Sequence, residues 1–205
     1  SSIVVQTIIK PKTTIMKIVH ILTAVLLSAS VFQLNAQTEA SGVKKATIVL
    51  ADGSSLTGLA KDNIRKNASV VFAANEGDKK KTYHGSELNG AEIEGVKFIC
   101  IKGDFFKVHC EGDLSFLQKA SDASGKVVYN GNEAVVSSGT DGKLNDYFIY
   151  NSKDKQLTLV SKKNVDEVVS TNFAGCAVAI NKAKEINGDL SQLRSAVELY
   201  NNRNK

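Results

Sequence analysis

Apolar and polar residues alternate along most of the chain between residues 46 and 160, in short runs separated by turn residues. A two-residue period is that of a β-strand with one buried face. It predicts strands at 46–50, 56–61, 68–73, 80–84, 93–110, 114–117, 126–129, 134–137, 147–150 and 157–160. Dipeptides such as Asp52-Gly53 and Asn130-Gly131 favour the tight turns of hairpins. The pattern therefore predicts a sheet built from successive hairpins.

The segment 93–110 is the most strand-like part of the chain, because β-branched and aromatic residues dominate it. If Gly103 and Asp104 form the loop, Lys102 faces Phe105 and the next pairs follow outward. Directly opposed side chains share one face of a sheet. One apolar face then consists of Ile99, Ile101, Phe106 and Val108. The opposite, mixed face carries Phe98, Cys100, Phe105, Lys107 and His109.

From about residue 164 the period of the apolar residues becomes helical. One short turn fits Val165, Val168 and Val169. Two amphipathic helices follow, with apolar stripes at Cys176, Ile180 and Ala183 and at Leu190, Leu193, Val197 and Tyr200. The predicted class is α+β, mainly β: an antiparallel sheet or partly open barrel of hairpins, with two C-terminal helices packed on it.

The segment Met16–Ala36 reads as a signal peptide, with Lys17 as its basic start and a mostly apolar stretch to Phe32. Ala36 suits the last position before the cut, so we expect Gln37 to begin the mature chain. Residues 1–15 precede the only Met, and we interpret them as a gene-model extension or as a longer basic start. The predicted destination is the periplasm or the outside of the cell.

The remaining chain is predicted to hold a loose leader at 37–45 and one β-rich domain at 46–205. The 169 residues from 37 to 205 are enough to bury a core without a metal or disulfide. Because Lys10, Lys12 and Lys17 lie before the cut, the formal net charge falls from +5 to +2. The densest basic run, Lys79–Lys81, suits a solvated loop or strand edge. We therefore predict no nucleic-acid partner and no membrane span after cleavage.

Three cysteines remain after the predicted cut, and export permits a disulfide between two of them. All three have apolar neighbours, so three buried thiols are the other interpretation. If a disulfide forms, we expect Cys176 to take part, with Cys110 or Cys100 as its partner; the sequence leaves that choice open.

No motif in the sequence specifies a reaction. It contains no HExxH, CxxC, GxSxG or calcium-binding loop, and its glycines are scattered as turn residues. We predict no metal and no cofactor. A thiol nucleophile at Cys100 or Cys110, with His84 as base, competes with the simpler view that these cysteines pack in strands.

Four aromatic residues are candidates for a binding face. Phe98 and Phe105 lie on the mixed face of the central hairpin, and Tyr147 and Tyr150 on a later strand. The competing interpretation is that the C-terminal helices cover the two phenylalanines, since apolar helix stripes need a sheet to pack on.

Several segments resemble a group of small exported proteins of Bacteroidota that have no assigned activity. These segments are NAQ at Asn35–Gln37, ATIVLADGSSLTG at Ala46–Gly58, YFIYNSKDKQLTLV at Tyr147–Val160, NFAGC at Asn172–Cys176 and SQLRSAVELYN at Ser191–Asn201. The resemblance implies export, a β-rich body and a cysteine-bearing helical C-terminus, and it implies no reaction.

The sequence thus favours a non-enzymatic exported protein, a binding or cell-envelope-associated module with an envelope protein as partner. Two alternatives stay open. One is a periplasmic hydrolase or thiol-dependent enzyme, which needs titratable groups that converge in a cleft. The other is a β-barrel carrier, which needs an apolar pocket for a small ligand.

Overall fold

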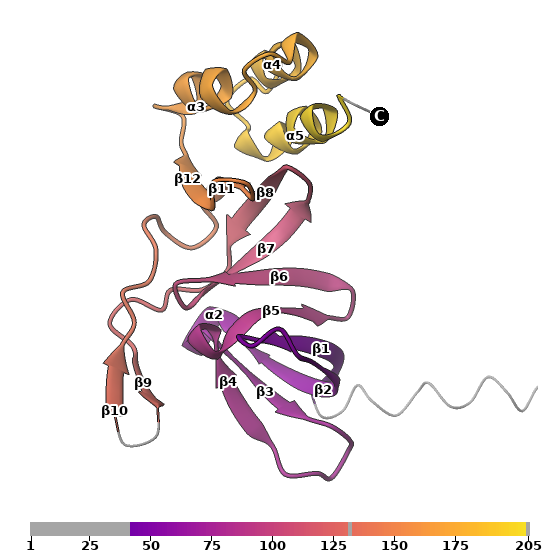
Figure 1. Cartoon of the computed structure of the whole chain (residues 1–205), viewed down its shortest axis with the longest axis vertical. Coiled ribbons are helices and arrows are strands. Elements are labelled where there is room, and N and C mark those ends of the chain that lie inside the picture. Colours follow the sequence, from indigo (N-terminus) through magenta and orange to yellow (C-terminus); the bar gives the residue numbers. More distant parts are fainter. Residues whose placement is uncertain (1–41, 131–132, 204–205) are drawn as a thin grey trace, which may run out of the picture. The chain divides into compact units, whose positions relative to one another are not determined.

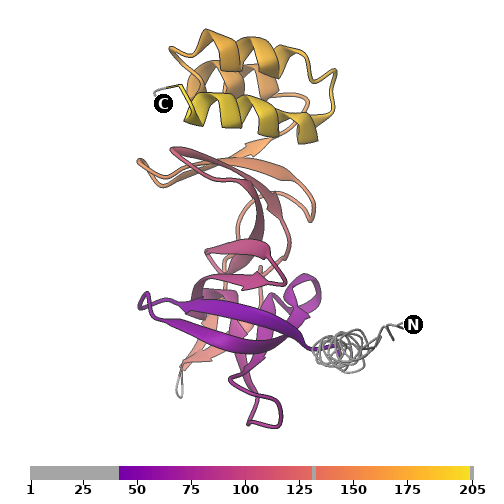
Figure 2. The ribbon, with the colours of Figure 1, turned by 90° about the vertical axis from the view of Figure 1, so that its right-hand side faces the viewer.

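The computed structural model describes residues 42–130 and 133–203. The predicted signal peptide with its cut between Ala36 and Gln37, the upstream segment 1–15 and the first part of the leader lie outside these residues. Ten strands form one antiparallel sheet in the order β12-β11-β8-β7-β6-β5-β1-β2-β3-β4 (Figures 1 and 2). The end strands β12 and β4 are not paired with each other, so the sheet is open. The mainly β class with packed C-terminal helices is confirmed.

The strands of the ten-stranded sheet agree with most of the predicted runs. They are β1 (Lys44–Leu50), β2 (Ser55–Asn63), β3 (Ser69–Ala73), β4 (Lys81–His84), β5 (Leu88–Ile93), β6 (Val96–Ile101), β7 (Asp104–Cys110), β8 (Leu114–Lys119), β11 (Tyr147–Asn151) and β12 (Gln156–Val160). A short helix, α2 (Ile64–Asn67), and a 3-10 turn, η2 (Gly85–Glu87), lie between strands.

Strand β5 is absent from the sequence-based prediction, which placed a turn through Gly85 and Gly90. It runs between β1 and β6 near the middle of the sheet. A Cβ at Gly90 would lie 2.5 Å from the carbonyl oxygen of Phe98 on β6. Gly90 therefore permits a close approach between two backbones, a use of glycine inside a strand that its sequence context does not distinguish from a turn.

The central hairpin β6–β7 differs from the predicted register by two residues. Its loop is Lys102-Gly103, with φ angles of 50° and 86°, and Ile101 pairs with Asp104. Two consecutive positive φ angles are those of a type I′ hairpin turn. Because the side-chain period is two, this slip keeps every residue on its predicted face. Ile99, Ile101, Phe106 and Val108 do lie together in one cluster.

Three clusters of apolar side chains form the core. The first lies among β1 to β7 and α2 and includes Ile48, Val70 and Phe105. The second joins β8 and β11 to the C-terminal helices through Phe116, Ile149 and Leu193. The third is built on Phe106, Leu117 and Phe148.

The C-terminal region contains three α-helices in the part of the chain that the structure describes, one more than expected. They are α3 (Val165–Asn172), α4 (Ala177–Lys184) and α5 (Leu193–Asn201), with a 3-10 turn η3 (Leu190–Gln192) before α5. The additional helix, α3, extends the turn predicted at Val165. Helix α5 contacts β7 and β8, and α3 contacts β12. No helix in the described residues is long and apolar enough to cross a bilayer.

A separate hairpin, β9 (Val127–Asn130) and β10 (Glu133–Val136), forms a two-stranded sheet of its own. Figure 1 shows it apart from the ten-stranded sheet. A backbone hydrogen bond between Gly125 and Ser137 closes its base, which is joined to the rest by bonds from the Lys126 ammonium group to the carbonyl oxygen of Lys66 and from the Ser137 hydroxyl to that of Lys102. We call this hairpin the arm.

Candidate functional site

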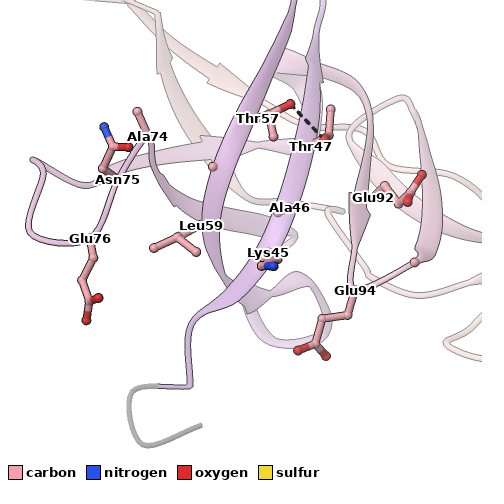
Figure 3. Close-up of a pocket in the computed structure, with 12 residues that line it drawn as sticks. Lys45, Ala46, Thr47, Thr57, Leu59, Ala74, Asn75, Glu76, Glu92 and Glu94 are labelled. Atoms are coloured by element: carbon pink, nitrogen blue, oxygen red, sulfur yellow. Dashed lines mark hydrogen bonds between the residues drawn. The ribbon is translucent and has the colours of Figure 1, made fainter. Parts of the chain in front are cut away.

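A groove of about 660 Å³ crosses the outer surface of β1, β2 and β5 (Figure 3). Its lining comes from four chain segments that the sheet brings together. The lining residues are Lys45, Ala46, Thr47, Thr57, Gly58, Leu59, Ala74, Asn75, Glu76, Glu92, Glu94 and Gly95. None of them was a candidate from the sequence, because each looks like an ordinary strand or turn residue.

The floor of the groove follows from the strand alternation of β1 and β2. Ala46 is buried beneath the sheet, whereas Thr47 lies on the groove side and pairs with Thr57. The two hydroxyl oxygens are 3.2 Å apart. Lys45 pairs with Leu59 in the same ladder. The floor therefore combines hydroxyl groups with aliphatic carbon.

One wall of the groove depends on Gly58. A Cβ there would lie 2.3 Å from the carbonyl oxygen of Ala73. The missing side chain lets the segment after β3 lie directly against β2, which brings Asn75 and Glu76 to the groove. This is a position where any other residue would displace the wall.

The opposite wall is acidic. Glu92 pairs with Thr47 in the ladder of β5 and β1, and Glu94 follows in the turn between β5 and β6. Lys44 donates a hydrogen bond of 2.7 Å to Glu94, and this bond and the charge of the carboxylate raise the pKa of Lys44. Because Lys44 pairs with Glu94, the carboxylates left to face a ligand are those of Glu76 and Glu92, against the one ammonium group of Lys45. The local charge of the groove favours a cationic ligand or segment.

The titratable groups that line this groove are Lys45, Glu76, Glu92 and Glu94. The lining includes neither cysteine nor histidine. In the described ranges no three His, Cys, Asp or Glu side chains are grouped as metal ligands. The groove offers hydroxyl, amide and carboxylate groups at the edges of a mostly apolar surface.

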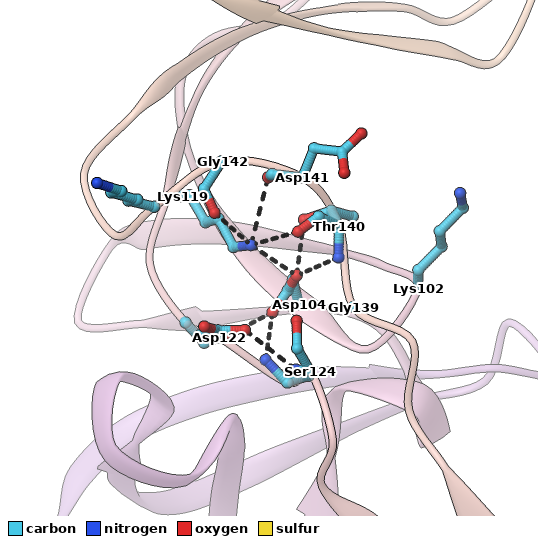
Figure 4. Close-up of polar contacts among 12 residues, drawn as sticks. Lys102, Asp104, Lys119, Asp122, Ser124, Gly139, Thr140, Asp141 and Gly142 are labelled. Carbon is cyan, nitrogen blue, oxygen red and sulfur yellow. Dashed lines mark hydrogen bonds and ion pairs between the residues drawn. The ribbon is translucent and has the colours of Figure 1, made fainter.

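A second polar cluster surrounds a buried ion pair (Figure 4). Asp104, the first residue of β7, is 0% exposed, and Lys119, the last residue of β8, is 1% exposed. The Lys119 Nζ lies 3.2 Å from Asp104 Oδ2. Asp104 also accepts hydrogen bonds from the backbone N–H of Ala123 at 2.6 Å and from the hydroxyl and N–H of Thr140 at 2.6 and 2.7 Å.

The ammonium group of Lys119 also has hydrogen-bond partners for all its N–H groups. Its ammonium group donates to the carbonyl oxygens of Thr140, Asp141 and Gly142 at 2.7, 3.3 and 3.2 Å. These three carbonyl groups belong to the long connection between β8 and β11. Both charged groups make their hydrogen bonds with other groups of the same chain. The pair therefore holds that connection and the arm base in place and is not free to bind a ligand. Sequence reasoning placed Asp104 in the loop of the central hairpin and did not consider Lys119.

The four predicted binding-face aromatics are not brought together. Phe98 and Phe105 pack with strands β1 to β5 and α2, so the sheet, not the C-terminal helices, covers them. Tyr147 packs against the helical cluster and Tyr150 against the third cluster, on the other face of β11. The four aromatic side chains therefore pack in three different apolar clusters.

The three cysteines are free thiols, so the structure contains no disulfide of Cys176 with Cys110 or Cys100. Cys176 and Cys110 belong to the helical cluster, whereas Cys100 packs against the first cluster. Burial raises the pKa of Cys100 and Cys110, which disfavours the thiolate needed for nucleophilic attack. Thiol counting in denatured, unreduced protein should give three; a count of one would mean that a disulfide forms.

The two histidines in the described part of the chain, His84 and His109, also lie among structural contacts. The backbone N–H of His84 donates to Glu87 within η2. The His109 ring packs between Phe116 and Tyr147 and lies 3.2 Å from the amide oxygen of Gln118.

Comparison of the chain with protein-family models, with curated proteins and with solved structures finds no match.

Proposed function

We propose that this chain is an exported, non-enzymatic protein that binds a partner in the periplasm or outside the cell, as a cell-envelope-associated module. The signal-like segment Met16–Ala36 and the resemblance to small exported proteins of Bacteroidota support export. The groove over β1, β2 and β5 is the observation that supports binding. Its acidic walls suit a basic segment of an envelope protein.

Export has a direct test. N-terminal sequencing of the protein recovered from outside the cytoplasm should return Gln37. Recovery of a chain that begins at Ser1 or Met16, or retention of the whole protein in the cytoplasm, would overturn this half of the proposal without bearing on the groove.

Binding is tested separately with the purified chain from residue 37. We expect an extended oligolysine peptide to bind, and the double variant Glu76→Gln/Glu92→Gln to bind about tenfold more weakly, a difference of about 1.4 kcal/mol. Glu111→Gln is the matched control, because it removes a carboxylate that pairs with Lys97 outside the groove.

The outcomes of this comparison are distinct. Weaker binding by the groove variant alone supports the proposal. Equal binding by both variants would assign the affinity to general surface charge, and the absence of binding by the unsubstituted chain would remove the groove as a site for basic segments.

The other two functions suggested by the sequence gain no supporting observation. A thiol-dependent enzyme needs a thiolate beside a base, whereas burial raises the pKa of Cys100 and Cys110. A carrier of an apolar ligand needs an enclosed apolar cavity, whereas the described groove is open to solvent and has Glu76, Glu92 and Glu94 along it.

A further inference from the structure

The arm exposes more large apolar side chains than any other part of the described chain. Tyr129 is 73% exposed, Val136 63%, Val135 51% and Val127 47%. Val127 pairs with Val136, and Tyr129 with Ala134, so one face of the arm is wholly apolar. The strand β10 is exposed along its whole length and has β9 as its one neighbour in the described sheet.

A hairpin with such an exposed apolar face is stabilised when a further strand or surface covers it. Two strands alone are marginally stable in water, and three or more with an apolar face are needed for independent stability. An unpaired strand edge is a template for another strand. We propose that β10 pairs antiparallel with β10 of a second copy of this chain, around a two-fold axis, to give a four-stranded sheet.

The side-chain pattern selects one register for this pairing. Paired residues must share a face, so the axis passes through a residue pair of the same number. Centred on Val135, the pairing sets Ala134 beside Val136 of the second copy and Glu133 beside its Ser137. Centred on Ala134 instead, it would set the carboxylate of Glu133 beside valine. The first register joins apolar side chains to apolar ones.

The apolar faces of the two arms are complementary in size in this register. Ala134 is small and stands between Tyr129 and Val136 of the second copy. The tyrosine ring therefore extends over Ala134 toward that valine, within the range of diagonal contacts for aromatic side chains.

Charge complementarity supports a second copy as the occupant. Glu133 is the one acidic residue on the described strands of the arm, and it lies away from the base. At the base, Ser137 donates its N–H to the carbonyl oxygen of Lys126 and its hydroxyl to that of Lys102. A two-fold axis places Glu133 of each copy beside Ser137 of the other, and so one strand away from Lys126, whose ammonium group donates a hydrogen bond of 3.0 Å to the carbonyl oxygen of Lys66 in its own chain.

The contact is small. Four residues per strand cover much less than the roughly 800 Å² per partner of a standard stable interface. We therefore expect a weak dimer, whose population rises with protein concentration in sedimentation equilibrium.

A cysteine substitution on the axis tests the pairing. Facing residues in antiparallel strands have Cα atoms about 4.5–5.5 Å apart, within the range of a disulfide. Val135→Cys should therefore give a disulfide-linked dimer on mild oxidation. Val178→Cys on α4, whose native valine is 63% exposed, is the matched control and should link far less. Equal linking by the two variants, or by the unsubstituted chain, would overturn the proposal.

A charge exchange tests the orientation. Glu133→Lys should weaken dimerisation about tenfold, and adding Lys126→Glu should restore it, because residues 133 and 126 then again carry opposite charges on the same face, one strand apart. Circular dichroism checks that each variant is folded. Failure of the second substitution to restore the dimer would overturn the antiparallel arrangement. A chain that stays monomeric at every concentration but binds phosphatidylglycerol vesicles through the arm would assign the arm to a lipid surface and overturn the proposal.

Discussion

The hairpins β6–β7 and β9–β10 have similar sequences and opposite surroundings. Both consist mainly of β-branched and aromatic residues, yet Phe105 on β7 is fully buried and Tyr129 on β9 is 73% exposed. The difference comes from their neighbours: β6–β7 lies between β5 and β8, whereas the arm is outside that sheet. A local pattern thus specifies a strand, and distant segments decide whether its side chains are buried.

The largest loss of stability is expected from breaking the buried ion pair of Asp104 and Lys119, which anchors the arm base to β7. Asp104→Ala leaves the ammonium group of Lys119 buried without its carboxylate, which should cost about 3–5 kcal/mol in the free energy of unfolding. Glu111→Ala, which breaks the exposed pair with Lys97, should cost about 0–1 kcal/mol. Urea unfolding measures both, and equal losses would contradict the role assigned to Asp104.

Aromatic truncation compares the hairpins directly. Phe105→Ala opens a cavity in the first cluster and should cost about 3–5 kcal/mol. Tyr129→Ala on the monomeric protein should change stability by no more than about 0.5 kcal/mol, since the ring is exposed. Thermal unfolding at low protein concentration gives both values. A large loss at Tyr129 would show that the arm is packed within its own chain.

A smaller loss of stability is expected from substitutions of glycine in two hairpin turns, at Gly95 between β5 and β6 and at Gly103 between β6 and β7. Gly95→Ala and Gly103→Ala both place alanine at positive φ, 77° and 86°, which should cost about 1–2 kcal/mol each. Gly103→Ala should cost about 1 kcal/mol more, because its Cβ would lie 2.7 Å from Ser137 Oγ and disturb the hydrogen bond to Lys102. Equal losses in the free energy of unfolding, measured with urea, would show that Ser137 at the arm base moves aside without a loss of stability.

The smallest effect is expected at His109, near the end of β7. Burial lowers the pKa of His109, so the unfolded chain takes up a proton more readily than the folded one. Stability should therefore be unaffected above the ordinary histidine pKa of about 6.5 and fall as the pH drops below it. His109→Gln should lose part of this pH dependence. An identical melting-temperature profile for the variant between about pH 8 and pH 5 would contradict it.

The periodic part of the fold is predictable from sequence because its signals are local. Alternation locates nine of the strands in the large sheet, and a two-residue error in the β6–β7 loop leaves each face intact. The missing strand, β5, has Gly90 where a close backbone contact replaces a side chain. Such a contact depends on residue 98 and has no trace in the neighbouring sequence.

The groove and the ion pair are harder to predict because they depend on segments distant in sequence. Thr47 meets Thr57 across a hairpin, but Glu92 and Glu76 come from β5 and from the connection after β3. Asp104 and Lys119 are ordinary charged residues until the connection to β11 surrounds them. The aromatic residues Phe98, Phe105, Tyr147 and Tyr150 illustrate the reverse error, because an apolar side chain indicates burial more often than binding.

The position of β1 between β2 and β5 has a consequence for the order of folding. During synthesis β1 pairs with β2 as soon as the hairpin emerges, but its other edge has no partner until Leu88–Ile93 follows. That pairing joins residues some forty positions apart and closes a long loop, which is slow in chains dominated by distant contacts. Until then Ile48 and its neighbours stay uncovered, so this interval is when the nascent chain is most prone to aggregation.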